Sequence, residues 1–391
     1  MIDLSYVQGV MEMSKRKELL EKHKTKVWQG KDNRWYVYLP DEKNGRVLKK
    51  RNTKTEIEDV IVSYWQEQLE NPTIQEVFDE WNNRRLELKK ISSATHLRNQ
   101  QVFNRHYSEF GCKRIKSITG DDIADFLERQ IPQYNLTAKA FSNLKTITRG
   151  LLKRAKKRKL INFNIEEIFD ELDTSDTDFK KVIKEDYQEV FSEEEMPIMM
   201  QYLVDNLDAK NIGILLMFVT GIRVGELVAL KHDVFDGNSF KIRRTETRYK
   251  VSKGEYAYDI KEYPKSEAGV RTVVIPEDYV WLCSKIKNLN PFGEYVFVDE
   301  KGKRMTTNCI RRRQERNCKA LGIYRKSPHK IRKTYGTILL DNNIDNRLIM
   351  GQMGHTDIMC TENHYHRNRR SIDRKSQVLS SIKEFQQINQ Q

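Results

Sequence analysis

Hydrophobic and polar positions change from one periodicity to another along the first part of the chain. Residues 1–25 are polar and charged and predict a helical leader without a clear buried face. The stretch "RWYVYLPDEKNGRVLKKRNT" then alternates apolar and polar positions around Asn44-Gly45, a dipeptide that favours a tight hairpin. "KVWQG" precedes it and the helically spaced "KTEIEDVIVSYWQEQL" follows. We therefore predict a three-stranded sheet with one helix over residues 26–69.

A helical spacing of apolar residues follows Pro72 and continues to about residue 172. Thr73 with Glu76 is typical of a helix start, and Phe78 and Trp81 share a face of that helix. A later helix, "AKAFSNLKTITRGLLKRAKKRKLI", ends in a dense run of lysines and arginines. Taken alone, such a run is as often a solvated helix face as a binding surface. The pattern predicts a helical bundle over residues 72–172.

A stretch poor in apolar residues, "DELDTSDTDFKK", predicts a linker at residues 173–186. Residues 187–391 mix helical patterns with a block of strands at 239–276. The predicted fold is therefore multidomain and mainly α with small β: an N-terminal sheet plus helix, a central helical bundle and a C-terminal mixed α+β domain. We see no internal repeat.

The charge and composition of the chain limit the kinds of molecule that it is expected to bind. The 391 residues include 70 Lys and Arg against 56 Asp and Glu, a formal charge of +14 that favours a polyanion such as nucleic acid. The longest apolar run, "ILLMFV", is far shorter than the roughly 20 residues that a membrane-spanning helix needs. The N-terminus lacks a signal-peptide pattern, and the five cysteines are scattered without a CxxC pair. We expect a cytoplasmic protein with no disulfide framework, zinc site or membrane partner.

Two segments of the last region place cations in unusual surroundings. "TGIRVGELVAL" puts Arg223 and Glu226 three apart in an otherwise apolar helix, and "YPKSEAGVRTVVIP" is typical of a hairpin with Lys265 near its tip. Each has an ordinary structural alternative. Arg223 could be only the ion-pair partner of Glu226, since buried arginines are usually paired. Lys265, on a turn, could be only a surface residue.

Two further segments add histidines and a tyrosine. "SPHKIRKTYGTILL" starts a helix with His329 and Arg332 on one face, and "MGQMGHTDIMCTENHYHR" places His355 ten residues before Tyr365. His329 and Arg332 could be only surface residues at a helix terminus. His355 and Tyr365 could be core residues whose polar atoms are hydrogen-bonded. Together, however, the four segments concentrate cationic side chains and a tyrosine in one region of a basic protein.

The chemistry of a nucleophilic tyrosine would explain why arginines, a lysine and histidines occur together with Tyr365. A phenol has a reference pKa of about 10 and attacks only if a neighbour accepts its proton. An attacked phosphodiester accumulates negative charge on its non-bridging oxygens, which fixed arginines can bind two at a time. The sequence shows no obvious carboxylate cluster for two magnesium ions and no GxxxxGK[ST] phosphate loop. We expect no cofactor and no metal.

These motifs resemble the tyrosine recombinase family, the integrases of phages and transposons. The family order of Arg, Lys, His-x-x-Arg, His and Tyr is matched by Arg223, Lys265, His329, Arg332, His355 and Tyr365, within "TGIRVGEL", "PHKIRKTYGT" and "MGHTDI". The resemblance covers the catalytic domain closely and the helical region more loosely. The N-terminal sheet resembles the arm-binding domain of integrases from mobile elements, particularly conjugative transposons.

The resemblance implies a role for each matched residue. Tyr365 attacks the scissile phosphate to leave a 3′-phosphotyrosyl bond and a free 5′-hydroxyl. Arg223 and Arg332 hold the phosphate oxygens, and Lys265 protonates the leaving 5′-oxygen. His329 assists proton transfer at the nucleophile, and His355 donates a hydrogen bond to the phosphate. Glu226 holds Arg223 in place. His366 orients the nucleophile or contacts the backbone.

The resemblance also implies partners. The expected partner is double-stranded DNA, bound at core sites and at accessory arm sites. The protein is expected to form a homo-oligomer, a tetramer when bound to DNA. Excisionase and DNA-bending proteins are expected accessory factors, and the active protein is expected at the bacterial nucleoid. The expected DNA contacts are Lys49, Lys50 and Arg51 in the sheet and Lys153, Arg154, Lys156 and Lys157 in the basic run. The C-terminal tail carries an apolar stripe that could dock on a neighbouring protomer or on its own domain.

Three other readings remain open. A DNA-binding relative without catalysis would keep the fold, but would not require all six matched residues. A type IB topoisomerase resembles the same catalytic core but has no need of accessory-site recognition. Recombinases that resolve chromosome dimers are typically shorter and usually lack the N-terminal module. The preferred hypothesis is a site-specific recombinase that integrates and excises a mobile element.

Overall fold

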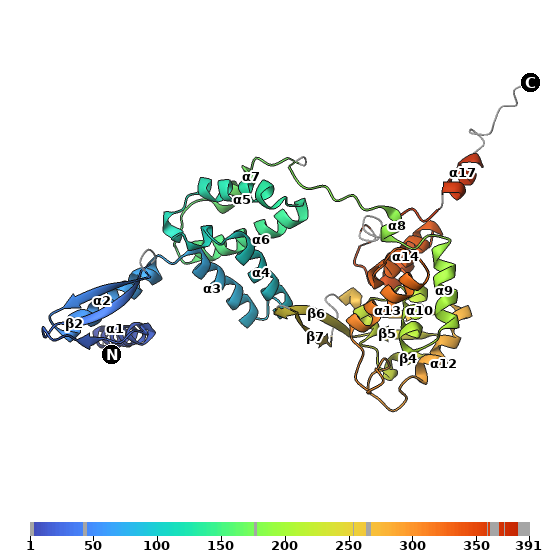
Figure 1. Ribbon diagram of the computed structural model, residues 1–391, viewed down its shortest axis with the longest axis horizontal. Helices are drawn as coiled ribbons and strands as arrows, with labels where there is room; N and C mark the ends of the chain where they lie inside the picture. Colours follow the sequence, from blue (N-terminus) through green and yellow to red (C-terminus); the bar gives the residue numbers. More distant parts are fainter. Residues whose placement is uncertain are drawn as a thin grey trace, which may run out of the picture. The chain divides into compact units, whose positions relative to one another are not determined.

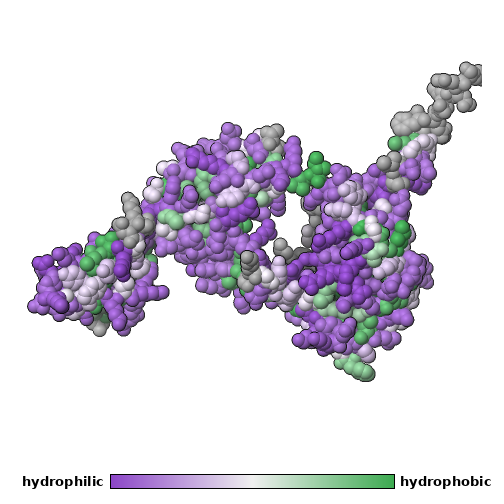
Figure 2. Space-filling view, viewed as in Figure 1, coloured by the Kyte–Doolittle hydropathy of each residue, from purple (hydrophilic) through white to green (hydrophobic). Residues whose placement is uncertain are grey.

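The computed structural model describes residues 4–41, 45–175, 178–252, 254–262, 267–357, 359, 367–370 and 372–381. The chain divides into two compact units, Met1–Val182 and Ile183–Gln391. Both consist mainly of helices with small antiparallel sheets (Figure 1), so the predicted fold class is confirmed. Figure 2 shows hydrophilic residues over most of the visible surface of each unit, with hydrophobic residues only in scattered patches.

The first unit begins with a sheet packed on a helix. The sheet has the order β1-β2-β3, with antiparallel neighbours, as the sequence predicts. Val37 and Leu39 of β2 pack on Ile57 and Ile61 of α2, because alternate strand residues share one face. The elements are α1 (Leu4–Lys22), β1 (Trp28–Gln29), β2 (Trp35–Asp41), β3 (Gly45–Arg51) and α2 (Lys54–Glu70).

The helix α1 packs on α2, which corrects the expectation of a leader without a buried face. Leu19 of α1 is buried, and Arg16 forms an ion pair with Asp59 of α2 at 2.5 Å. The sequence pattern does not reveal this contact because the buried position lies in a largely polar helix, without a continuous apolar stripe.

A helical bundle completes the first unit. Capping boxes begin α3 at Thr73 and α5 at Thr119, where each threonine hydroxyl accepts a bond from a backbone N–H inside the helix. The core includes a stack of Phe78, Phe103 and Tyr107. The helices are α3 (Ile74–Glu87), α4 (Ser93–His106), α5 (Gly120–Tyr134), α6 (Ala138–Lys157) and α7 (Ile165–Asp170).

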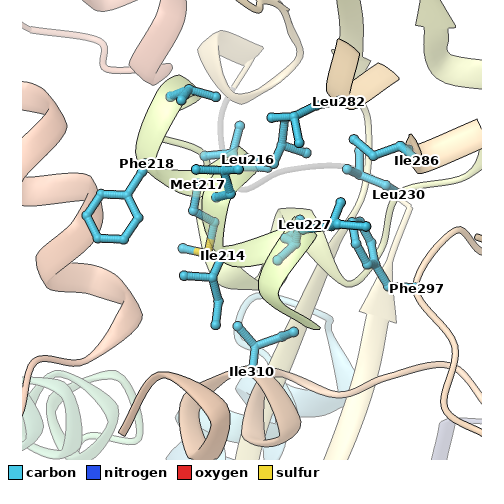
Figure 3. Close-up of a cluster of buried hydrophobic side chains, with 14 of the residues drawn as sticks. Ile214, Leu216, Met217, Phe218, Leu227, Leu230, Leu282, Ile286, Phe297 and Ile310 are labelled. Carbon is cyan, nitrogen blue, oxygen red and sulfur yellow. The ribbon is translucent and has the colours of Figure 1, made fainter. Parts of the chain in front are cut away.

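The second unit is organised around α10. Every residue from Asn211 to Thr220 is buried, which is typical of a helix surrounded by others. Figure 3 shows α10 side chains such as Ile214 and Phe218 among residues from neighbouring elements. The helices are α8 (Asp186–Glu189), α9 (Glu195–Asp205), α10 (Ala209–Thr220), α11 (Val224–Leu227), α12 (Trp281–Lys287), α13 (Thr307–Ala320), α14 (Pro328–Asp341), α15 (Asn346–Met353) and α17 (Ile372–Ser380).

The strands of this unit differ from the prediction. The first half of the expected hairpin over residues 263–276 lies outside the described residues, and its second half, β8, pairs with β5 in a sheet of order β4-β5-β8. A hairpin does form just upstream, between β6 and β7. Local alternation identifies strands but not their partners, so the pairing of β8 with β5 could not be predicted from the sequence. The strands are β4 (Phe235–Asp236), β5 (Ser239–Ile242), β6 (Thr245–Ser252), β7 (Glu255–Lys261) and β8 (Arg271–Val274).

Candidate active site

The site begins at a break between two helices, which corrects the prediction of one continuous apolar helix over 220–230. α10 ends at Thr220 and is capped by Gly221, whose φ of +65° favours glycine, and Arg223 precedes the first turn of α11. A Cβ on Gly221 would lie 2.2 Å from the ring of Tyr335 in α14. Glycine therefore both permits the sharp turn and lets α14 pack closely beneath it.

Glu226 lies at the centre of the site and joins two arginines. Its Oε1 accepts a bond from Arg223 at 2.7 Å, and its Oε2 accepts one from Arg271 at 2.8 Å. Burial by itself would raise the pKa of this carboxyl, but Arg271 and then Arg223 and Arg332 outweigh that effect and lower it to about 2. Glu226 is 2% exposed, whereas the side chain of Arg223 is 40% exposed and so remains accessible to a ligand.

Arg332 and His355 form the floor of the site. The guanidinium of Arg332 donates to the carbonyl of Gly221 at 2.7 Å, to the carbonyl of Met353 and to Nε2 of His355 at 2.8 Å. Because a guanidinium only donates, Nε2 of His355 must accept, and the neutral ring carries its proton on Nδ1. Arg332, 1% exposed, thus ties together the two loops that hold Arg223 and His355.

Both histidines of the set are neutral near pH 7. Burial, followed by the charges of Arg332, Arg223 and Arg271, lowers the pKa of His355 to about 3. Desolvation, with the charges of Arg332 and neighbouring cations, lowers the pKa of His329 to about 4. His329 is nevertheless open to solvent at the start of α14. It can therefore accept a proton from a group that approaches this surface.

Arg271 is a site residue that the sequence reasoning missed. It is 7% exposed, grips both oxygens of Glu226, and donates to the carbonyl of Gln352 at 2.8 Å. A signal was present, because Arg271 alternates with Thr272 and so shares the buried face of β8 with Val273. An arginine on an inward strand position requires an acidic partner, and Glu226 supplies it.

Several predicted residues lie outside the described part of the chain: Lys265, Tyr365 and His366. The apolar stripe of the tail lies there too, apart from its first residue, Val378 in α17. The structure brings together the other five members of the predicted set, Arg223, Glu226, His329, Arg332 and His355, through the contacts and shared charges given above.

The basic run at the end of α6 is largely engaged in internal contacts. Arg154 and Arg158 both pair with Glu80 of α3, and Lys153 pairs with Glu166 at 2.9 Å. Lys156 donates to the carbonyl of Phe163 at 3.1 Å. The predicted DNA contacts at Lys153, Arg154, Lys156 and Lys157 therefore compete with intramolecular partners at three of the four positions.

The cations of β3 lie on two different faces of the N-terminal sheet. Lys49 stands opposite Val37, on the face that packs on α2, and Lys50 stands opposite Tyr36, on the outer face. Arg51 shares the α2 side with Lys49. The outer face also carries Trp28, which stacks on Tyr36 at 5.7 Å. Lys50 is therefore the member of the predicted trio that adjoins an aromatic platform.

In the described part of the chain, no helix has both the length and the apolar character needed to cross a membrane. Among the same residues, no cluster of three or more His, Cys, Asp or Glu side chains is arranged to hold a metal ion.

Comparisons with known sequences add a family assignment for most of the second unit. Residues 189–371 match the model of the phage integrase family. Tyrosine recombinase XerD of Chlamydia trachomatis is 29% identical over 184 residues, covering 46% of this chain and 56% of that protein. The prophage ps2 probable integrase of Lactococcus lactis is 24% identical over 262 residues, covering 60% and 68%. The chain spans about half the length of the first two curated relatives it matches.

Solved structures show a similar fold. The Tn1549 transposon integrase in complex with transposon right end DNA superimposes with a TM-score of 0.60 at 18% identity, covering 79% of this chain and 99% of that one. A lambda integrase dimer bound to a COC′ core site gives a TM-score of 0.52 at 14% identity, covering 88% and 95%. At these identities the likeness concerns the fold alone.

Proposed function

Residues 189–371 belong to the phage integrase family, and on that premise we propose that this protein is a site-specific DNA recombinase that integrates and excises a mobile element. The observation that carries the proposal is the cluster in which Glu226 joins Arg223 to Arg271 and Arg332 bonds His355. Three arginines around one buried carboxylate leave a net positive site, and the most exposed of them, Arg223, faces solvent. Such a site suits a phosphodiester.

The proposed reaction is a transesterification. The Oη of Tyr365 attacks the phosphorus, a phosphotyrosyl bond forms, and the bond to the 5′-oxygen breaks. The phenol proton passes to His329, which is neutral near pH 7 and open to solvent. Lys265 donates a proton to the leaving 5′-oxygen. Attack by the 5′-hydroxyl of a second strand reverses these steps and reseals the DNA. One phosphoester bond forms for each that breaks, so the proposed reaction consumes no ATP and includes no metal ion.

The other charged and polar residues of the site bind the phosphate or orient the groups that react. Arg223 binds the non-bridging oxygens directly, because its guanidinium is accessible while Glu226 keeps it oriented. Arg332, buried beneath, adds its charge to the phosphate and fixes the loops on either side. His355 donates from Nδ1 to the phosphate, and His366 orients the nucleophile.

The other segments take roles in DNA binding. Residues 26–69 serve as the arm-type module, with Lys50 and the aromatic outer face of the sheet toward an accessory site. Lys49 and Arg51 lie on the α2 side and would contact DNA only at the edge of the sheet. Residues 72–172 clamp the core site through the basic end of α6. Solved structures of integrases bound to DNA, one of them a lambda integrase tetramer bound to a Holliday junction, support a tetramer on DNA as the working form. Excisionase and DNA-bending proteins would direct integration against excision.

A nicked duplex that carries the element's junction tests the proposal. Purified protein is incubated with it in the absence of metal, and a denaturant-resistant adduct is measured for wild type, Tyr365→Phe and Tyr335→Phe. We expect an adduct with wild type and Tyr335→Phe and none with Tyr365→Phe. Tyr335 is a matched control because burial raises the pKa of its phenol, which disfavours attack.

Other outcomes would select other functions. An adduct that persists in Tyr365→Phe would move the nucleophile elsewhere. Tight duplex binding without any adduct would establish the catalytically silent relative. Relaxation of supercoiled plasmid without strand exchange between two sites would favour the topoisomerase reading.

A further inference from the structure

Residues 189–195, near the start of the second unit, contact one helix of the candidate active site and the chain beyond Tyr365. On one side they contact α14, which carries His329 and Arg332. On the other side they contact residue 369, four positions after Tyr365 in the sequence. These contacts lie outside the set of residues that the recombination chemistry uses.

Glu189 secures the contact with α14. It is 3% exposed, and its two carboxylate oxygens accept bonds from Lys330 and Lys333, one oxygen for each lysine. Burial opposes ionisation, but the two lysines outweigh it and lower the pKa of Glu189 to about 2. His329 and Arg332 are the immediate sequence neighbours of these lysines, so a shift of either lysine would move a site residue.

Backbone and side-chain bonds extend this contact along the segment. The backbone N–H of Phe191 donates to the hydroxyl of Thr334 in α14 at 2.9 Å. Glu195 accepts two bonds, each 2.8 Å, from Lys326, whose side chain is fully buried just before α14 begins. Residues 189–195 therefore hold three residues of α14, Lys330, Lys333 and Thr334, and Lys326 just before it.

Arg369 secures the contact with the chain beyond Tyr365. Its Nε donates to the carbonyl of Phe191 at 3.0 Å, and its own carbonyl accepts the backbone N–H of Glu193 at 3.2 Å. Phe191 thus uses its N–H for α14 and its carbonyl for Arg369. A single residue connects the helix that presents the phosphate-binding side chains with the segment that follows the nucleophile.

We propose that residues 189–195 form a positioning strut for the recombination reaction, in which Glu189 holds α14 and Arg369 anchors the segment that follows Tyr365 in the sequence. The inference rests on the proposed function. Neither residue is catalytic. Each acts through its neighbours by keeping the nucleophile and the phosphate-binding groups in one geometry, and a displacement of about 1 Å can cost about 100-fold in rate.

The test separates cleavage from binding. Single-turnover adduct formation at saturating nicked DNA and the affinity for the same DNA are measured for Glu189→Gln and Arg369→Gln. We expect the cleavage rate constant to fall about 10- to 100-fold, while the affinity changes less than about threefold. Matched controls are Glu185→Gln and Arg370→Gln, which change exposed residues close in sequence to Glu189 and Arg369 and should leave both quantities as in wild type.

Hydrogen exchange supplies an independent readout. Arg369→Gln should speed exchange at the amide of Glu193 and leave the amides of α10 protected, which shows that the unit stays folded. If Glu189→Gln loses that protection, Arg369→Gln alone decides the question. The positive result is slower cleavage with intact folding and unchanged affinity.

Two results would overturn the strut, and they differ from failure of the proposed function. Wild-type cleavage rates in both variants would show that the contacts do not position the reaction. Unchanged exchange at Glu193 in Arg369→Gln would show that the contact does not hold this segment. Absence of any adduct from wild type would instead overturn the proposed function and the positioning role with it.

Discussion

Two carboxylates in this molecule each hold two arginines, but in different surroundings. Glu80, in the first unit, pairs with Arg154 and Arg158, and its side chain is 34% exposed. Glu226, in the second unit, pairs with Arg223 and Arg271 and is 2% exposed. Solvent still reaches and weakens the half-buried pairs of Glu80, whereas breaking the fully buried pair of Glu226 leaves a charge without compensation. The same kind of ion pair should therefore contribute little to the stability of the first unit and much more to that of the second.

The largest expected effect is that of Glu226→Gln. The change removes the charge that compensates Arg271, and we expect the unfolding free energy of the second unit to fall by about 3–5 kcal/mol. Native-state hydrogen exchange at α10 measures this quantity without interference from the first unit. A loss below about 1 kcal/mol, of the size expected of an exposed pair, would show that the two carboxylates are equivalent.

A pH effect of intermediate size is expected from His355. Its pKa is about 3 in the folded protein, against an ordinary value of 6.5 for histidine, so between these values the unfolded chain binds a proton that the folded chain does not. Stability should therefore fall as the pH drops from 6.5 toward 3, by at most about 1.4 kcal/mol per pH unit from this group. Exchange at α10, followed from pH 7 to 4.5 in wild type and His355→Gln, should show a shallower dependence in the variant. Identical slopes would contradict the assignment.

The smallest effect is expected from Glu80→Gln. The half-buried pairs of Glu80, which solvent still reaches, should contribute roughly 1 kcal/mol to the unfolding free energy of the first unit. The same change frees Arg154 and Arg158, so affinity for duplex DNA should rise modestly, with a steeper salt dependence. Fluorescence anisotropy at two salt concentrations measures both quantities. Unchanged binding would indicate that the end of α6 does not contact DNA.

The features that could be predicted from sequence are those encoded locally. The hairpin pattern around Gly45, the capping boxes at Thr73 and Thr119 and the apolar α10 depend on neighbouring residues, and the structure contains each of them. Motif spacing likewise selected Arg223, Glu226, His329, Arg332 and His355, whose side chains the fold assembles. The predicted roles of Lys265 and Tyr365 remain predictions that the adduct experiment tests.

Only the tertiary structure decided which segments pair. It placed β8 beside β5 and made Arg271 the buried partner of Glu226, and it joined Glu189 to the two lysines of α14. These contacts link residues far apart in the chain, so no local periodicity or motif encodes them. Their energies depend on burial, which is a property of the folded packing. Sequence thus determined which elements form and which side chains carry the chemistry, and long-range packing determined what holds those side chains in place.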